Sequence, residues 1–150
     1  MAKPNVEFFE EGVGRTGAVI AGRNTYDVSE AWGGRGPIPT LSLFVVTHRV
    51  PKQVPAGDPP YTFVTEGVEV AVDQARGAAG GKDVHLMGAS IVQQAIRAGL
   101  LDELIISLVP IVLGRGIRLL DNLAPGALKL NLERVVDAPG VTHLTYRVIK

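Results

Sequence analysis

The sequence predicts an α/β fold in which a mixed, mostly parallel sheet ends in a C-terminal antiparallel hairpin. Three observations support this class. Short apolar runs rich in β-branched residues recur along the chain and end at polar turns. Segments with apolar residues at helical spacing lie between several of these runs. Near the C-terminus, polar and apolar residues instead alternate on both sides of a turn, as in a hairpin.

The first part of the chain supplies the parallel strands. We expect them at Ala18–Ala21, Leu43–Thr47, Tyr61–Thr65 and Val84–Met87. A helix is predicted at Val68–Ala79, where apolar residues recur at helical spacing and Gly80 and Gly81 end the pattern. A second helix is predicted at Ile91–Ala98, because Ser90 and Gln93 have the spacing of a capping box and Gly99 suits a C-terminal cap.

The remaining strands follow the second helix. Leu104–Ile111 is apolar nearly throughout, so we expect a central strand there. Leu128, Leu130 and Leu132 then alternate with polar residues. After the turn at 137–140, Thr142, Leu144, Tyr146 and Val148 should share one face of the last strand. These two stretches predict the antiparallel hairpin.

Length, charge and cysteine content limit the possible functions. The 150 residues have the size of one ordinary domain and include no long polar linker, so we expect one domain over 1–150. Fifteen basic and fifteen acidic residues cancel, which argues against nucleic acid as a partner. The lack of cysteine fits a reducing compartment, and no signal peptide or membrane-spanning stretch is evident. A soluble, cytoplasmic protein is therefore expected.

Polar clusters follow three predicted strands. Two of them, "GRNT" and "GASI", lie where a strand leads through glycine into a helix, and the third is "THR". A helix start offers unpaired backbone N–H groups to an anion, and in open α/β sheets ligands collect at the carboxyl ends of the strands. Singly, each cluster is explained by a turn, a cap or a surface charge. Together they predict a site for one extended anion such as a dinucleotide.

Other chemistries lack support in the sequence. His48, His85 and His143 show no spacing typical of metal ligands, so we expect no metal. Neither a serine-hydrolase elbow nor a P-loop occurs. The only tryptophan, Trp32, could line a pocket or cover the core.

Four stretches together resemble one known family. They are "TGAVIAGRNTYD", "FVVTHR", "VHLMGAS" and "AGLLDELIISLVPIVLGRGIRLLD", of which the last is the most specific. The chain resembles the dihydrofolate reductase-like fold over almost its whole length. It is most similar to the reductase domain of the riboflavin-biosynthesis bifunctional deaminase–reductase and its stand-alone relatives.

The resemblance implies a three-layer fold and a homodimeric oxidoreductase that uses NADPH, without metal, to reduce a small pterin-like, pyrimidine-like or carbonyl-type substrate. The cofactor would be bound by three groups of residues. Gly22, Arg23, Asn24 and Thr25 would hold its phosphates, with Arg23 a candidate for the 2′-phosphate; Thr47, His48 and Arg49 would lie beside the adenosine ribose and its phosphate, where a bidentate arginine would favour NADPH over NADH; and Gly88, Ala89, Ser90 and Ile91 would cover the pyrophosphate. No substrate-binding residue or proton donor is indicated.

The N-terminus departs from the family pattern. "MAKPNVEFFEEGVG" resembles the family's first helix, so the opening strand that normally precedes it is expected to be absent. Another segment or a second subunit would fill its place, or the sequence is a fragment or has a misassigned start. Two further functions therefore stay open. One is a catalytically silent homologue that binds a nucleotide or another small ligand, and the other is an interaction protein that accepts a strand from a partner.

Overall fold

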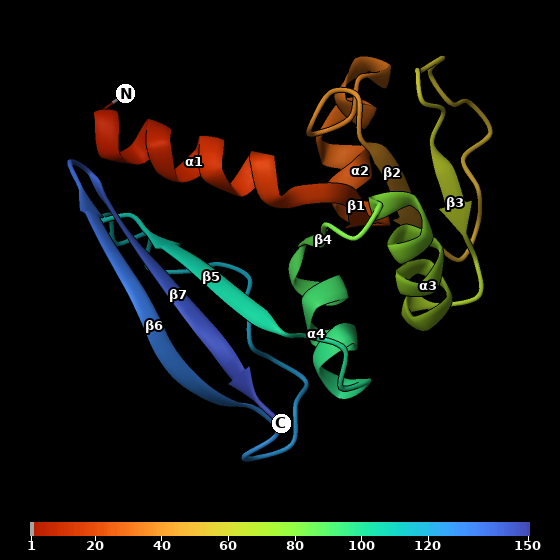
Figure 1. Cartoon of the computed structure of the whole chain (residues 1–150). Helices are drawn as coiled ribbons and strands as arrows, with labels where there is room; N and C mark the ends of the chain where they lie inside the picture. Colours follow the sequence, from red (N-terminus) through yellow and green to blue (C-terminus); the bar gives the residue numbers. More distant parts are fainter. Residues whose placement is uncertain (1) are drawn as a thin grey trace.

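The computed structural model describes residues 2–150 (Figure 1). Its helices and strands, in chain order, are α1 (Lys3–Arg15), β1 (Thr16–Gly22), α2 (Arg23–Val28), the 3-10 helix η1 (Glu30–Gly34), β2 (Ser42–Val46), β3 (Thr62–Val64), α3 (Val68–Ala79), β4 (Asp83–Met87), α4 (Ala89–Arg97), β5 (Glu103–Leu108), β6 (Lys129–Ala138) and β7 (Val141–Ile149). The predicted α/β class is confirmed. None of the helices within residues 2–150 combines the length and apolar character needed to cross a bilayer.

The strands form two sheets rather than one. A parallel sheet has the order β3-β2-β1-β4, and an antiparallel sheet has the order β5-β7-β6. Between β4 and β5, the described part of the chain provides no strand, so each of these two strands pairs on one side only. Figure 1 shows the antiparallel sheet separate from the parallel one. α1 leads from β1 to the antiparallel sheet, and its first turn lies near the turn between β6 and β7.

Helical segments cover both faces of the parallel sheet, because alternate residues of a strand point to opposite sides. Ala18 and Ile20 of β1 pack with α3 in one core cluster, which also includes Ile91 of α4. Val19 and Ala21 pack on the other face with Tyr26 of α2 and with residues of η1. The expected layering of helices around a central sheet is therefore present.

Two contacts connect the sheets. Val92 and Ile96 of α4 pack with Leu104 of β5, and partly buried side chains from β4, β6 and β7 join this cluster. At the end of α1, the Arg15 guanidinium bonds the carboxylates of Asp83 (Nε to Oδ2, 3.0 Å) and Glu103 (Nη2 to Oε1, 3.1 Å). Because Asp83 and Glu103 are the first residues of β4 and β5, the two strands start at the same end.

Both predicted helices are confirmed, with two corrections to the second. α3 has the predicted bounds, and Gly80 ends it in the left-handed conformation. α4 begins at Ala89 with Gly88 as its N-cap, two residues earlier than the predicted start. The expected capping box is wrong, because Ser90 already lies inside the helix and its hydroxyl accepts a hydrogen bond from Gln94 Nε2 (3.0 Å).

The prediction of a long central strand at Leu104–Ile111 is also wrong. β5 ends at Leu108 and forms the edge of the antiparallel sheet. Its side chains are only partly covered, with Ile105 and Leu108 exposed by 40% and 58%. An apolar run is typical of a central strand that is buried on both faces. Among residues 2–150, however, β5 pairs only with β7, and the side chains of Ile105 and Leu108 are left exposed.

The hairpin of β6 and β7 is confirmed, and α1 covers one of its faces. Leu144, Tyr146 and Val148 are partly buried as predicted, yet His143 on the opposite face is only 1% exposed. Its Nδ1 bonds the hydroxyl of Ser107 and its Nε2 bonds Asn5 Oδ1 of α1, both at 2.8 Å. The ring also stacks on Phe8 with a centroid distance of 4.0 Å. His143 therefore attaches α1 to the antiparallel sheet.

Candidate functional site

The three polar clusters lie at the carboxyl ends of three neighbouring strands. β1 ends at Gly22, β2 is followed by Thr47, and β4 is followed by Gly88. Since the order of these strands is β2-β1-β4 and all are parallel, their ends lie along one edge of the sheet. We call this edge the corner, consisting of residues 22–25, 47–49 and 88–91. The sequence predicted that the three clusters converge on one ligand, and the fold places them along one edge.

Arg23 connects the first cluster to the second. Its Nε donates to both carboxylate oxygens of Asp27, one helical turn later, at 2.9 and 3.0 Å. Its Nη1 donates to Thr47 Oγ1 at 3.2 Å and to the main-chain carbonyl oxygen of Arg49 at 2.6 Å. One guanidinium thus joins α2 to the loop after β2. Sequence reasoning missed Asp27, although an Arg–Asp pair at i,i+4 on a helix is a recognisable signal.

The loop after β2 is held by its own hydrogen bonds. Thr47 is 7% exposed, and its hydroxyl donates to the carbonyl oxygen of Arg49 at 2.9 Å. The Thr47 hydroxyl oxygen in turn accepts a hydrogen bond from the Arg49 backbone N–H at 3.3 Å. The side chains of His48 and Arg49 are exposed, and within residues 2–150 the Arg49 guanidinium has no hydrogen-bond or ion-pair partner. The corner therefore presents a free positive charge on a fixed loop.

The first and third clusters are in direct contact. A Cβ atom placed on Gly88 would lie 2.6 Å from Thr25 Oγ1, so the Thr25 hydroxyl occupies the space above this glycine. Gly88 has φ 103° and ψ 139°, a conformation that suits glycine. α4 starts directly after it without a side-chain cap, which leaves its first backbone N–H groups free of side-chain partners. Ile91 is only 2% exposed, so it offers the corner its backbone alone.

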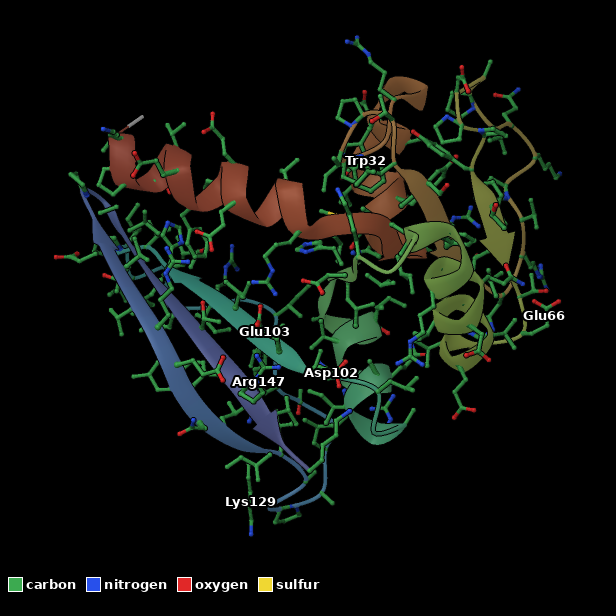
Figure 2. The ribbon with its side chains drawn as sticks, viewed as in Figure 1. Trp32, Glu66, Asp102, Glu103, Lys129 and Arg147 are labelled. Atoms are coloured by element: carbon green, nitrogen blue, oxygen red, sulfur yellow. The ribbon has the colours of Figure 1, made fainter. Side chains whose placement is uncertain are left out.

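An aromatic cluster supports the corner from one face of the sheet. Tyr26 is buried and meets Tyr61 and Phe63 edge-on, with centroids 6.0 and 5.5 Å away. Burial, followed by the nearby Tyr61 and Asp27, raises the pKa of Tyr26, so its phenol stays protonated at neutral pH. Trp32, labelled in Figure 2, packs against this same cluster. Of the two readings left open for Trp32, the structure favours the one in which it covers the core.

Four side chains of the corner are exposed, namely those of Asn24, His48, Arg49 and Ser90. The described part of the molecule also has two hollows. One is lined by Val68, Gln94 and Arg97, and the other by Ile96, Leu128 and Val148, among others. On the antiparallel sheet, Figure 2 shows Glu103 beside Arg147, whose charged atoms are 3.8 Å apart. The first hollow adjoins the corner, because Gln94 donates a hydrogen bond to the Ser90 hydroxyl. All residues of the corner belong to the parallel sheet and its connections.

Comparison with known proteins identifies the family and the fold. Residues 15–144 match the family model described as the RibD C-terminal domain. A riboflavin biosynthesis protein from Shewanella sp. PV-4 has 25% identity and a TM-score of 0.75, with 92% of this chain and 77% of that chain covered. No curated protein sequence gives a significant match.

Two further solved structures share the fold. Acinetobacter baumannii RibD has 16% identity and a TM-score of 0.69, with 99% of this chain covered but only 51% of RibD, so the chain spans about half of that protein. Enterococcus faecalis dihydrofolate reductase, complexed with NADP(H) and RAB-propyl, has 16% identity and a TM-score of 0.65, with 100% of this chain and 84% of that chain covered.

Proposed function

Because the chain belongs to the RibD C-terminal domain family and has the fold of dihydrofolate reductase-like reductases, we propose that it is an NADPH-dependent reductase. Its substrate would be a small heterocycle of the pterin or pyrimidine kind, or a carbonyl compound. Residues 1–150 would act as one reductase domain. The lack of cysteine supports a cytoplasmic location.

The observation that carries this proposal is the meeting of the three clusters at one corner. Arg23 hydrogen-bonds to the loop of Thr47 and Arg49, and Thr25 contacts Gly88. A dinucleotide is long enough to need several anion-binding groups along one edge of a sheet, and such ligands bind outside the carboxyl ends of parallel strands. The corner offers free backbone N–H groups at the start of α4, the Ser90 hydroxyl and the Arg49 guanidinium.

The shape and chemistry of the corner fit this cofactor. Since no side chain caps the start of α4, its first backbone N–H groups could bind a pyrophosphate, with the Thr25 hydroxyl beside Gly88 as a further donor. Arg49 would bind the 2′-phosphate that distinguishes NADPH from NADH, with His48 beside it. NADPH, when bound, would supply the hydride. The residues of this chain would bind and orient the cofactor, and none of them is assigned as the proton donor.

We propose that a second copy of the chain covers the apolar segment after β5. Ile111, Val112, Leu113 and Ile117 are exposed by 67%, 96%, 79% and 83%. A cluster of exposed aliphatic side chains of this kind marks a protein interface. The reductase would accordingly be a homodimer, and light scattering should give twice the mass of one chain. A monomeric mass that persists at high protein concentration would exclude this arrangement.

Cofactor titration tests the proposal. We expect Trp32 fluorescence to report NADPH binding, because its cluster includes Tyr26 and Met87 at the edge of the corner, and calorimetry should give the same Kd. Arg49→Ala should weaken NADPH binding by about 1.5–3 kcal/mol, or about 10- to 150-fold, and leave NADH nearly unchanged. Arg76→Ala, on the exposed side of α3, is the matched control. Equal losses for both cofactors would exclude the role of Arg49.

The break between the sheets favours a second candidate function. β4 and β5 each have an unpaired side, and sheet edges readily accept an extended segment. In this alternative, a strand from a partner fills the space between β4 and β5, and the corner binds a nucleotide without turnover or binds none. The purified chain would then associate with extended peptides, and NADPH would not be oxidised with any pterin, pyrimidine or carbonyl substrate. Turnover by the chain alone would exclude this candidate.

A further inference from the structure

We propose that Arg23 is a positioning residue, which acts on the cofactor's 2′-phosphate through Arg49 and does not bind it directly. The inference rests on the proposed NADPH site and concerns how that site distinguishes NADPH from NADH. It departs from the expectation that Arg23 is itself a candidate ligand of the 2′-phosphate.

The hydrogen bonds of Arg23 are the first observation. Its Nε is occupied by both carboxylate oxygens of Asp27, and its Nη1 by the Thr47 hydroxyl and the Arg49 carbonyl oxygen. A guanidinium has five N–H donors in a fixed planar arrangement. Two of its three nitrogens therefore already have partners within the protein, and binding a phosphate in bidentate fashion would require breaking some of these bonds.

Charge is the second observation. Asp27 bonds the Arg23 guanidinium in an ion pair of 2.9 Å, so the positive charge is already balanced by a carboxylate. A phosphate at the same guanidinium would lie near Asp27 and be repelled by it. Arg49 differs in both respects, since its guanidinium is exposed and has no partner within residues 2–150. The available charge at the corner thus belongs to Arg49.

The link between the two arginines is the Arg49 main chain. Arg23 Nη1 donates to the Arg49 carbonyl oxygen at 2.6 Å, and the Thr47 hydroxyl donates to the same oxygen at 2.9 Å. Arg23 also donates to that hydroxyl, so the three groups form a closed set of hydrogen bonds. This set fixes the backbone from which the Arg49 side chain extends. Removing Arg23 should free the loop and reduce the contribution of Arg49.

A double-mutant cycle distinguishes two cases. In the first, Arg23 and Arg49 both bind the 2′-phosphate; in the second, only Arg49 binds it and Arg23 positions Arg49. If both arginines bound the 2′-phosphate, their losses in the NADPH-to-NADH affinity ratio would add. If Arg23 acts through Arg49, each single substitution lowers the ratio, but Arg23→Ala has little further effect once Arg49 is alanine. A purely structural role for Arg23 would weaken both cofactors equally and leave the ratio unchanged.

The experiment measures Kd for NADPH and NADH by calorimetry in the wild type, Arg23→Ala, Arg49→Ala and the double variant. We expect Arg49→Ala to lower the affinity ratio about 10- to 150-fold, Arg23→Ala to lower it to a smaller extent, and the double variant to match Arg49→Ala within about twofold. Additive losses, or a ratio unaffected by Arg23→Ala, would overturn the inference. Failure of the wild type to bind either cofactor would instead refute the proposed function.

A second pair of variants keeps the test valid if Arg23→Ala does not fold. Thr47→Val removes the hydroxyl that connects Arg23 to the Arg49 carbonyl oxygen. It should lower the affinity ratio in the wild type and leave it unchanged in the Arg49→Ala background. Thr47→Ser keeps the hydroxyl and should lose less than Thr47→Val. Binding of 2′,5′-ADP and 5′-AMP gives the same comparison without the nicotinamide, and a loss of equal size for both nucleotides would argue against the inference.

Discussion

Replacing Gly88 with alanine tests the contact that brings the first and third clusters together. The new Cβ would lie 2.6 Å from Thr25 Oγ1 and 3.7 Å from Thr25 Cβ. Alanine would also have to adopt φ 103°, where side chains are strained. Strain of this kind costs about 1–3 kcal/mol, and displacing the Thr25 side chain from its rotamer adds about 0.5–1.5 kcal/mol.

We therefore expect Gly88→Ala to lower the free energy of unfolding by about 2–4 kcal/mol. For a chain of this length that corresponds to a fall in Tm of about 5–15 °C. Thermal unfolding followed by circular dichroism measures the change, and urea unfolding gives an independent value. The same variant should weaken NADPH and NADH alike, because it alters the proposed pyrophosphate region and not the 2′-phosphate contact.

Two further variants separate backbone strain from the clash. Gly67 has a similar backbone conformation, φ 102° and ψ 176°, but nothing lies within 4 Å of its Cβ position, so Gly67→Ala should show the backbone strain alone. Thr25→Ala removes the oxygen that Gly88→Ala would strike, and the double variant should regain about 1 kcal/mol. The reasoning fails if Gly88→Ala is as stable as the wild type, or if Thr25→Ala gives no recovery.

Two other substitutions test the contacts between elements. His143→Phe removes the bonds to Asn5 and Ser107, which should lower the free energy of unfolding by about 1–3 kcal/mol in urea titrations; an unchanged midpoint would mean that these bonds contribute nothing. Gln93 is 6% exposed and bonds the carbonyls of Arg118 and Leu119, so Gln93→Leu should speed trypsin cleavage at Arg118 about fivefold or more. Gln94→Leu is its control, and equal rates for both variants would contradict this reading.

Features that depend on local sequence could be predicted. α3 matches its predicted bounds because helical spacing and the following glycines are contained in one segment. The strands of the parallel sheet were found for a similar reason, since each is a short apolar run between turns. The meeting of Gly22, Thr47 and Gly88 at one edge could also be predicted, because the carboxyl ends of neighbouring parallel strands must lie together.

Features that depend on backbone conformation or on distant contacts could not be predicted. Ser90 looks like a cap in sequence, but the conformation of Gly88 starts α4 earlier and places Ser90 inside it. The apolar sequence of β5 is typical of a central strand, but the sequence does not show which strands will pair with it, and β5 lies at the edge of its sheet. His143 shows no sequence signal of its burial, since that depends on α1, more than a hundred residues away in the chain. The predicted strand was also too long, since the apolar run continues to Ile111 whereas β5 ends at Leu108.

The division of the molecule into two sheets makes stability and cofactor binding separable. Every residue of the corner belongs to the parallel sheet or its connections, whereas His143 attaches α1 to the antiparallel sheet. Substitutions more than about 10 Å apart without shared partners usually act independently. His143→Phe should therefore lower the unfolding midpoint and leave the Kd for NADPH unchanged. If the affinity falls together with stability, α1 and the antiparallel sheet must help to hold the corner in its binding conformation.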